Sequence, residues 1–292
     1  MRSFFPGHML KKYDTIPDLQ HVLAYQRENK KSIGFVPTMG ALHQGHLSLI
    51  EACNNACNAS VASIFVNPTQ FNDPEDYKKY PKDNPIDWHM LEEAGCDFLF
   101  SPSVPEMYPD ESTKKIDFDP GTLGERLEGA SRPGHFKGMA VVVKRLFDIV
   151  MPDKAFFGQK DYQQYLIVKN MVAHFEMPIE VVKCPIIREP NGLAMSSRNE
   201  RLSPEIRQGA GIIYKTLTKA AQQVRDNSIS FDQIMHEGKM VLEGLGNFTV
   251  DYFDICSAID LKPAHQNGPD DELIVLTAVY ADGVRLIDNV LV

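Results

Sequence analysis

The sequence predicts an α/β protein in which a parallel sheet with flanking helices is followed by a smaller α+β domain. Two observations support this fold class. Over the first two-thirds of the chain, short apolar runs alternate with stretches whose apolar residues recur at helical spacing, as in parallel α/β sheets. After Arg188 the pattern changes to two amphipathic helices followed by three β-rich runs. We therefore expect one domain over residues 1–187 and a second over 188–292.

The expected elements of the first domain alternate along the chain. Short apolar runs predict strands over residues 33–36, 61–66, 98–100, 155–157 and 179–187. Apolar residues at helical spacing predict helices between them, over residues 47–54, 84–94, 141–149 and 162–175. This order of elements predicts a Rossmann-like parallel sheet with helices on its faces.

The second domain is expected to combine helices with antiparallel strands. Ser203-Pro204, with Glu205 close behind, is typical of a helix start and predicts one long amphipathic helix to about Arg225. A further helix is predicted over residues 231–243, ending near Gly244. Strands follow over residues 250–255, 273–280 and 284–289, and the turn residues Ala281-Asp282-Gly283 predict a hairpin between the last two.

The composition limits the classes of function. The 292 residues include 43% hydrophobic and 24% charged ones, which is typical of a soluble globular protein. A net charge of −9 argues against nucleic acid as a partner, and no apolar run has the length of a membrane span. Residues 1–9 lack the apolar core of a signal peptide, so we expect a tail and a cytoplasmic protein. The five cysteines are scattered and form no C-x-x-C pair, so buried thiols are expected rather than disulfides.

The sharpest motif is Pro37-Thr38-Met39-Gly40-Ala41-Leu42-His43-Gln44-Gly45-His46. It follows a predicted strand and opens a predicted helix, where backbone N–H groups and the helix dipole attract anions. Gly40 and Gly45 allow the backbone to approach a ligand closely. His43 and His46 share one face of the first turn, where their rings can donate to phosphate oxygens and stabilise a departing pyrophosphate.

An isolated H-x-x-H also has a plainer interpretation, in which the two histidines are only capping neighbours at a helix start. A zinc site is disfavoured, because no cysteine pair or glutamate lies at ligand spacing beside the histidines and no third ligand can be named. No metal site built by the protein is therefore expected.

A second segment favours the phosphate interpretation. H-x-G-H after a strand resembles the HIGH signature of the nucleotidylyltransferase superfamily, which pairs it with a downstream loop resembling KMSKS. Met195-Ser196-Ser197-Arg198 occupies that place here. Two hydroxyls and a guanidinium on a glycine-containing loop suit a mobile clamp over the β- and γ-phosphates. Alone, Ser-Ser-Arg would be a solvated turn, so the order of the two motifs carries the interpretation.

Further segments resemble the pantothenate synthetase family. They are Val66-Asn67-Pro68-Thr69-Gln70-Phe71, Ser131-Arg132-Pro133-Gly134-His135-Phe136 and Phe157-Gly158-Gln159-Lys160-Asp161-Tyr162-Gln163-Gln164. With the histidine motif, the resemblance runs from about Gly34 to Arg201. It implies an AMP-forming ligase of pantothenate biosynthesis, in which ATP and pantoate form pantoyl adenylate and pyrophosphate, and β-alanine then releases AMP. It also implies Mg²⁺ on the triphosphate and a homodimer.

The resemblance assigns the residues of the ATP site. His46 takes the place of the proton donor and His43 that of its phosphate-contacting partner, while Lys160 and Arg198 are the cations expected at the phosphates. The whole site implied by the family comprises Met39, Gly40, Ala41, Leu42, His43, Gln44, Gly45, His46, Gly158, Gln159, Lys160, Asp161, Ile187, Met195, Ser196, Ser197 and Arg198. Asp161 is expected on the ribose or Mg²⁺ side.

The family also implies the residues that hold the other substrates. Gln70 and Gln164 match the glutamines that bind pantoate, and an amide suits its hydroxyls and carboxylate because it both donates and accepts. Asn67 is expected near the β-alanine side. Arg132 and the neighbouring His135 either shape the pantoate pocket or order the loop on which they lie.

Each assignment has a plainer alternative when its residue is taken alone. Gln70 and Gln164 would be surface amides, as Gln163 is expected to be. Lys160-Asp161 would be an exposed ion pair that contributes little. Met39 would be a core residue behind the loop.

Three other classes of function compete with the ligase. A tRNA synthetase shares both motifs but needs an anticodon-binding domain and a basic surface, for which this chain is too short and too acidic. A nucleotidyltransferase would retain the nucleotide in its product, and the paired substrate glutamines favour the ligase. A nucleotide-sensing module is disfavoured because the leaving-group residues are complete.

Overall fold

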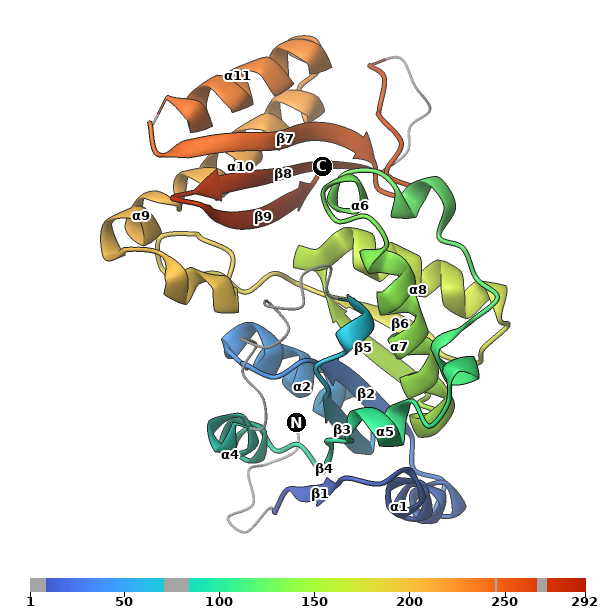
Figure 1. Cartoon of the computed structure of the whole chain (residues 1–292). Coiled ribbons are helices and arrows are strands. Elements are labelled where there is room, and N and C mark those ends of the chain that lie inside the picture. Colours follow the sequence, from blue (N-terminus) through green and yellow to red (C-terminus); the bar gives the residue numbers. More distant parts are fainter. Residues whose placement is uncertain (1–8, 71–83, 245, 267–271) are drawn as a thin grey trace. The chain divides into compact units, whose positions relative to one another are not determined.

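The structure is a computed structural model that describes residues 9–70, 84–244, 246–266 and 272–292, with elements labelled as in Figure 1. The expected N-terminal tail lies outside the described residues except for Met9, and Phe71 of the family-like segment also lies outside them. The chain divides into two compact units. The first contains the described residues up to Gly158 together with Ile167–Cys184, and the second contains Gln159–Leu166 and Pro185–Val292.

The first unit is built on a six-stranded parallel sheet in the order β1-β4-β3-β2-β5-β6. Its strands are β1 (Lys11–Tyr13), β2 (Ile33–Thr38), β3 (Ala59–Ile64), β4 (Phe98–Phe100), β5 (Lys154–Gly158) and β6 (Glu180–Cys184). The predicted sheet is confirmed, with β1 as a strand that the sequence did not indicate. β1 has three residues and two of them are lysines, which blunt an edge strand against pairing with other chains and hide its apolar pattern.

Helices link the strands of this sheet. The longer ones are α1 (Ile16–Glu28), α2 (Gln44–Ala56), α4 (Pro85–Glu93), α7 (His135–Val150) and α8 (Tyr162–His174). Single turns are α5 (Val104–Met107), α6 (Glu128–Ser131) and the 3₁₀ segments η1 (Pro68–Gln70), η2 (Glu111–Lys114) and η3 (Gly121–Gly124). α1 is missing from the predicted elements, although Thr15 caps its start by accepting the N–H of Asp18.

The two faces of the sheet are covered by different helices (Figure 1). Successive strand residues point to opposite faces. Phe35 of β2 meets Phe147 of α7 with ring centroids 6.3 Å apart. Its neighbour Val36 packs with Ile50 of α2 and Leu91 of α4 in the opposite core. All five side chains are fully buried, and each such burial contributes about 1.5–3 kcal/mol.

The second unit has an antiparallel sheet of β7 (Phe248–Ser257), β8 (Leu273–Ala281) and β9 (Val284–Leu291). The predicted hairpin is confirmed: β8 and β9 are joined by Asp282 and Gly283, whose φ values of 48° and 75° are those of the tight turn that matches strand twist. α10 (Ile212–Arg225) and α11 (Phe231–Glu243) pack on the sheet around Leu217, Ile234 and Phe253.

The prediction of one long helix from Pro204 to Arg225 is wrong. The chain forms α9 (Pro204–Gly209) and then α10, which begins only at Ile212. Gly209 and Gly211 weaken the helix between them, because glycine loses the most conformational freedom on folding. Gly211 is also packed so closely that a Cβ there would collide with the carbonyl oxygen of Asn191.

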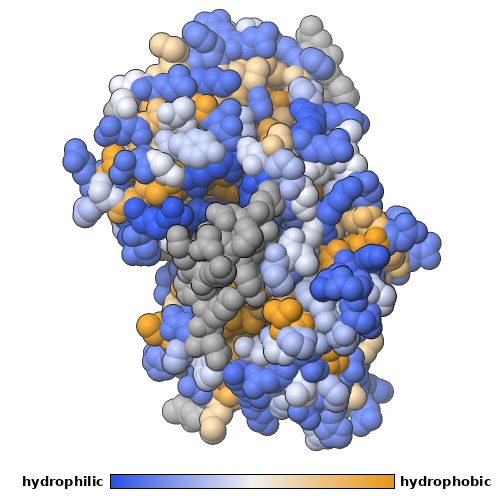
Figure 2. Space-filling view, in the orientation of Figure 1, coloured by the Kyte–Doolittle hydropathy of each residue, from blue (hydrophilic) through white to orange (hydrophobic). Residues whose placement is uncertain are grey.

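The surface and the cysteines agree with the composition. All five cysteines are buried free thiols, as expected. In the part of the chain that the structure describes, no helix has the length and hydrophobicity needed to cross a membrane. On the face shown in Figure 2, hydrophilic residues predominate and hydrophobic ones form small separate groups.

Candidate active site

The sheet of the first unit has a switch point between β2 and β5. From β2 the strands continue to β3 and β4 on one side and to β5 and β6 on the other. Open parallel sheets bind ligands in the crevice beyond the carboxyl ends of the strands at such a point. The candidate residues of this unit lie there in sequence: residues 39–46 follow β2, Asn67 and Gln70 follow β3, and Gly158 ends β5.

The loop after β2 has an unusual backbone that a buried carboxylate holds in place. Gly40 and Ala41 both have positive φ, 85° and 52°, and the latter is strained for a residue with a side chain. Asp87 of α4 accepts the N–H of Ala41 and that of Leu42, each at 2.8 Å. Asp87 is only 3% exposed, so this interaction is shielded from water and fixes the turn that leads into α2.

His43 and His46 cap the start of α2. His43 Nδ1 accepts the N–H of Gly45 at 3.1 Å, and His46 Nδ1 accepts the N–H of His43 at 3.3 Å. A neutral imidazole that accepts through Nδ1 carries its proton on Nε2. The ring centroids are 4.1 Å apart, so two N–H donors of neighbouring rings lie at the N-terminus of the helix. This arrangement suits an anion, to which the helix dipole adds attraction.

The turn after β3 is held by its own polar side chains. Asn67 is fully buried, and its Oδ1 accepts the N–H and hydroxyl of Thr69 and the hydroxyl of Tyr108, while its Nδ2 donates to the carbonyl of Gly138. Burial raises the pKa of Tyr108 to about 12, so its hydroxyl remains a donor. The fold therefore already engages both ends of the amide that was expected near β-alanine.

Arg132 and His135 order the same turn. His135 Nδ1 lies 3.1 Å from the carbonyl oxygen of Gln70, and its Nε2 lies 3.1 Å from Nη1 of Arg132. With the proton on Nδ1, His135 donates to Gln70 and accepts from Arg132. His135 and Gln70 are both 8% exposed. These contacts support the interpretation in which the two residues order the loop, and they fix the backbone that carries Gln70.

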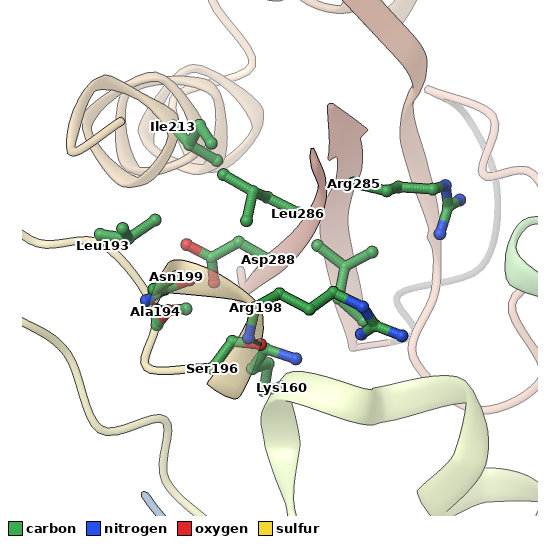
Figure 3. Close-up of a pocket in the computed structure, with 11 residues that line it drawn as sticks. Lys160, Leu193, Ala194, Ser196, Arg198, Asn199, Ile213, Arg285, Leu286 and Asp288 are labelled. Carbon is green, nitrogen blue, oxygen red and sulfur yellow. Dashed lines mark hydrogen bonds between the residues drawn. The ribbon is translucent and has the colours of Figure 1, made fainter. Parts of the chain in front are cut away.

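In the second unit, a pocket of about 300 Å³ gathers three candidate residues (Figure 3). They are Lys160 from η4 (Gln159–Asp161), Ser196, and Arg198 from η5 (Ser197–Arg201). The full lining is Lys160, Leu193, Ala194, Ser196, Arg198, Asn199, Ile213, Arg285, Leu286, Ile287 and Asp288. Lys160 Nζ is 3.6 Å from Asp161; the lysine side chain is 15% exposed and the aspartate side chain 51% exposed, so only one partner of this ion pair is exposed.

A short hairpin leads into the serine-rich loop of this pocket. Arg188 and Ala194 pair as an antiparallel bridge, and the N–H of Met195 donates to the carbonyl of Ile187 at 2.9 Å. Ser196 then caps η5 by accepting the N–H of Arg198. The loop is thus anchored at its base while Arg198 itself is exposed.

Comparison with known proteins decides the family. A family model described as pantoate-beta-alanine ligase matches residues 11–291. A pantothenate synthetase from Cytophaga hutchinsonii is 46% identical over 278 residues, which cover 95% of this chain and 98% of the relative.

The chain belongs to the pantoate–beta-alanine ligase family.

Solved structures agree with this assignment. A pantothenate synthetase from Thermus thermophilus is 42% identical with a TM-score of 0.86, covering 96% of this chain and 98% of that one. A pantoate-beta-alanine ligase from Francisella tularensis, solved in complex with beta-gamma ATP and beta-alanine, is 34% identical with a TM-score of 0.78, covering 97% of this chain and 98% of that one. The sequence-based recognition of the family is therefore confirmed.

The residues predicted from the family resemblance differ in their exposure. Among those of the ATP site, Gly40 and Leu42 are buried, Gln44, Asp161, Ser197 and Arg198 are exposed, and Met39, Ala41, His43, Gly45, His46, Gly158, Gln159, Lys160, Ile187, Met195 and Ser196 are half-buried. Gln164 and Arg132 are half-buried, whereas Asn67 and Gln70 are buried. The expectation that Gln163 is a surface amide is wrong: it is 5% exposed, because α8 begins at Tyr162 and places it inward.

Sequence reasoning missed Asp87, which in this member of the pantoate–beta-alanine ligase family holds the histidine loop. Its position in the first turn of α4 suggests only a favourable interaction with the helix dipole. The two N–H groups that it accepts lie 45 and 46 residues earlier in the chain, and no local pattern indicates that pairing.

Proposed function

We propose that this chain condenses pantoate with β-alanine at the expense of ATP, through a pantoyl-adenylate intermediate, and releases AMP and pyrophosphate. The observation that supports it most directly is the pair of adjacent imidazoles at the N-terminus of α2, each accepting a backbone N–H through Nδ1, in a chain that matches the ligase family over residues 11–291. The complex of the Francisella relative with beta-gamma ATP and beta-alanine supports the same nucleotide and the same amine here.

The first step brings two anions together, the pantoate carboxylate and the α-phosphate of ATP. The carboxylate oxygen attacks the α-phosphorus and the bond to the bridging oxygen of pyrophosphate breaks, so negative charge grows on the leaving group. His46 acts as the donor to that group and His43 contacts the phosphates. Donors fixed in advance at such a position stabilise the transition state without reorganisation.

The remaining phosphate contacts are assigned to Lys160 and to the serine-rich loop. Lys160 and Arg198 supply positive charge to the β- and γ-phosphates, and the hydroxyls of Ser196 and Ser197 donate to their oxygens. Gly158, Gln159, Asp161 and the backbone of Ile187 bind the rest of the nucleotide. Residues 1–187 then serve as the nucleotide- and pantoate-binding domain, and residues 188–292 as the smaller domain that carries the KMSKS-like loop.

Pantoate is held by Gln70 and Gln164 through its hydroxyls and carboxylate, with Arg132 beside them and Asn67 on the β-alanine side. In the second step the β-alanine amine attacks the acyl carbon of the mixed anhydride, and the acyl–oxygen bond to AMP breaks. The protein provides no nucleophile, because the anhydride is already activated. Its contribution is to hold amine and anhydride within reacting distance and to exclude water.

Magnesium is proposed as a partner of the triphosphate. Mg²⁺ in such sites is held chiefly by phosphate oxygens and water. Over the ranges that the structure describes, no three His, Cys, Asp or Glu side chains gather as a metal-binding group. Bound to the triphosphate, the ion would neutralise phosphate charge. A cytoplasmic location and a homodimer complete the proposal, and sedimentation velocity checks the latter.

The deciding experiment measures pyrophosphate and AMP release from ATP. With pantoate alone, we expect one equivalent of pyrophosphate per site and little free AMP; adding β-alanine should then release AMP. Folded protein that forms no pantoate-dependent pyrophosphate would overturn the proposal. AMP release that needs no amine would point to hydrolysis of the adenylate rather than to ligation.

A further inference from the structure

Strand β9 carries two adjacent buried polar side chains, Asp288 and Asn289, each 3% exposed. Neighbouring residues of a strand point to opposite sides of the sheet, so the two side chains reach different segments. None of the roles assigned above uses either residue.

Asn289 holds the segment from which Lys160 extends. Its Nδ2 donates to the carbonyl oxygens of Gln159 and Lys160, both at 3.0 Å. Its Oδ1 accepts from Nε2 of Gln159 at 3.1 Å. Two hydrogen bonds from this buried amide therefore fix the backbone of η4 and a third holds the side chain of Gln159, and only a group with both a donor and an acceptor end can make all three.

Asp288 holds the base of the serine-rich loop. Its carboxylate pairs with both terminal nitrogens of Arg188, at 2.6 and 2.9 Å. The same guanidinium donates to the carbonyl of Gly192 at 3.0 Å and lies 3.6 Å above the ring of Tyr214. Arg188 is paired with Ala194, so this contact fixes the hairpin that continues into Ser196 and Arg198.

The burial of Asp288 argues for a role in geometry. Burial raises the pKa of Asp288, and the opposing attraction of Arg188 does not cancel it. A buried ion pair often contributes no more stability than apolar residues of the same volume would, because both charges lose their hydration. What the bidentate pair does provide is geometry, because it fixes the guanidinium of Arg188 in one orientation.

The two segments that Asn289 and Asp288 hold both contribute a cation to the same pocket. Figure 3 shows Lys160 and Arg198 on one side of it, whereas the carboxylate of Asp288 points away from them toward Ala194 and Asn199. Two cations on separate segments bind one polyphosphate well only if their spacing is fixed before the ligand arrives. A misplacement of about 1 Å can cost on the order of 100-fold in rate.

We propose that Asp288 and Asn289 are positioning residues, which set the spacing of Arg198 and Lys160 for the triphosphate. This inference rests on the proposed function, in which those two cations contact the β- and γ-phosphates. Asp288 acts through Arg188 and the hairpin, and Asn289 acts through the carbonyls of η4.

The first test replaces Asn289 by Asp, which keeps the shape and the acceptor but turns a carboxylate toward two carbonyl oxygens. We expect single-turnover pyrophosphate release at saturating pantoate to fall about 10- to 100-fold, with a higher KM for ATP and an unchanged KM for β-alanine. Val284→Ala is the matched control, because Val284 is a buried core residue of the same strand outside the pocket. An equal loss in both variants would reduce Asn289 to a stability role and overturn the proposal.

A double-mutant cycle tests whether Asn289 acts through Lys160. In a Lys160→Ala background, Asn289→Asp should slow pyrophosphate release no further than about twofold. If the rate losses of Lys160→Ala and Asn289→Asp multiply in the double variant, the proposal is overturned. The same holds for the second pair, if the rate losses of Asp288→Asn and Arg198→Ala multiply. If Lys160→Ala and Arg198→Ala themselves leave the rate unchanged, the assignment of the phosphate cations fails instead.

A readout without turnover separates the two failures further. Asn289→Asp should speed backbone hydrogen exchange in a peptide that covers Gln159–Leu166 by about tenfold or more beyond the increase that the destabilising Val284→Ala produces there. Unchanged exchange in the folded variant overturns the positioning role whatever the activity. If Asn289→Asp does not fold, Asn289→Ala, which removes the same hydrogen bonds without adding a charge, serves in its place with the same expected outcomes.

Discussion

The histidine motif illustrates how one residue can satisfy two interpretations. The sequence left open whether His43 and His46 are capping neighbours or phosphate donors. In the structure Nδ1 of each ring accepts a backbone N–H, which is the capping role. The same contact leaves the proton of a neutral ring on Nε2, which is the nitrogen that a donor role needs. The two interpretations therefore concern different atoms of the same side chain.

Substitutions that mimic one nitrogen at a time separate these roles. His46→Asn keeps a polar atom near the Nδ1 position and removes the Nε2 donor, so we expect adenylation to slow about 100-fold or more while the free energy of unfolding changes little. His46→Gln places an amide near Nε2 and should retain more activity. Single-turnover pyrophosphate release gives the rate and urea unfolding the stability. An unchanged rate in His46→Asn would exclude His46 as the donor.

Asp87 makes a second residue-level prediction. Asp87→Asn retains one acceptor and turns an NH₂ group toward one of the two N–H groups of Ala41 and Leu42. One buried N–H then lacks a partner, which costs about 1–3 kcal/mol in the free energy of unfolding. We also expect weaker ATP binding, because the histidine loop loses its anchor. Urea unfolding and ATP titration measure the two effects.

The control for this variant is Asp148→Asn, which removes an exposed carboxylate on α7 that pairs with Lys144. It should change the free energy of unfolding by less than about 1 kcal/mol and leave ATP binding intact. Equal behaviour of the two variants would show that the buried contacts of Asp87 contribute nothing specific.

The sequence predicts local chemistry better than it predicts partners. The strand–loop–helix context of Gly40, His43 and His46 is encoded within ten residues, and it was placed correctly. The partners of Asn67 come from Tyr108 and Gly138, 41 and 71 residues away. Nothing near Asn67 indicates that its amide is already engaged. Long-range polar pairing of this kind is the part of the site that the sequence could not supply.

At the level of elements, the errors in prediction have two physical causes. β1 is too short and too charged to show an apolar pattern, so the sequence does not indicate this parallel edge strand. The segment from Pro204 to Arg225 has continuous helical periodicity, which predicts a single helix and gives no sign of the break at Gly209–Gly211. That break is tertiary in origin, because Gly211 must lie against the carbonyl of Asn191. Periodicity reports which face is apolar and not whether the backbone runs straight.

Glu189 ties α9 to the hairpin that precedes the serine-rich loop, and its titration gives an element-level prediction. Its carboxylate accepts from Arg207 at 2.9 Å and from Asn199 at 2.7 Å. Burial acts to raise the pKa of Glu189, but these two hydrogen bonds outweigh it and hold the pKa below its usual value. The carboxylate thus contributes stability above the unfolded-state pKa of about 4.3, and this contribution is lost as the pH falls through the lower folded-state pKa.

We therefore expect the difference in unfolding free energy between wild type and Glu189→Gln to be largest near neutral pH and to shrink below about pH 4. Urea titrations from pH 3 to pH 7 measure it. Glu200→Gln is the control, since Glu200 pairs with the same Arg207 but is 73% exposed. Its effect should stay below about 1 kcal/mol. A difference for Glu189→Gln that does not depend on pH would contradict the prediction.

At the scale of the whole molecule, the division into units follows the chain in an unexpected way. The change of pattern after Arg188 predicts a single boundary near residue 187, whereas the second unit also contains Gln159–Leu166. The chain therefore passes between units after Gly158, Leu166 and Cys184. The second of these passages interrupts α8, whose first residues belong to one unit and whose last residues belong to the other.

This shared helix predicts that the two units unfold together. α8 has 13 residues, and half of it would be too short to persist as a helix in water. Unfolding of either unit should therefore destabilise the part of α8 that belongs to the other unit.

Trp88, the single tryptophan of the chain, lies on α4 in the first unit, so its fluorescence follows the unfolding of that unit. Circular dichroism at about 222 nm follows the helices of both units. We expect the two urea transitions to coincide, and we expect Val284→Ala, a change confined to the core of the second unit, to lower the midpoint seen by Trp88. Two separate steps, with the Trp88 step unmoved by Val284→Ala, would mean that α8 does not couple the units and that each is stable alone.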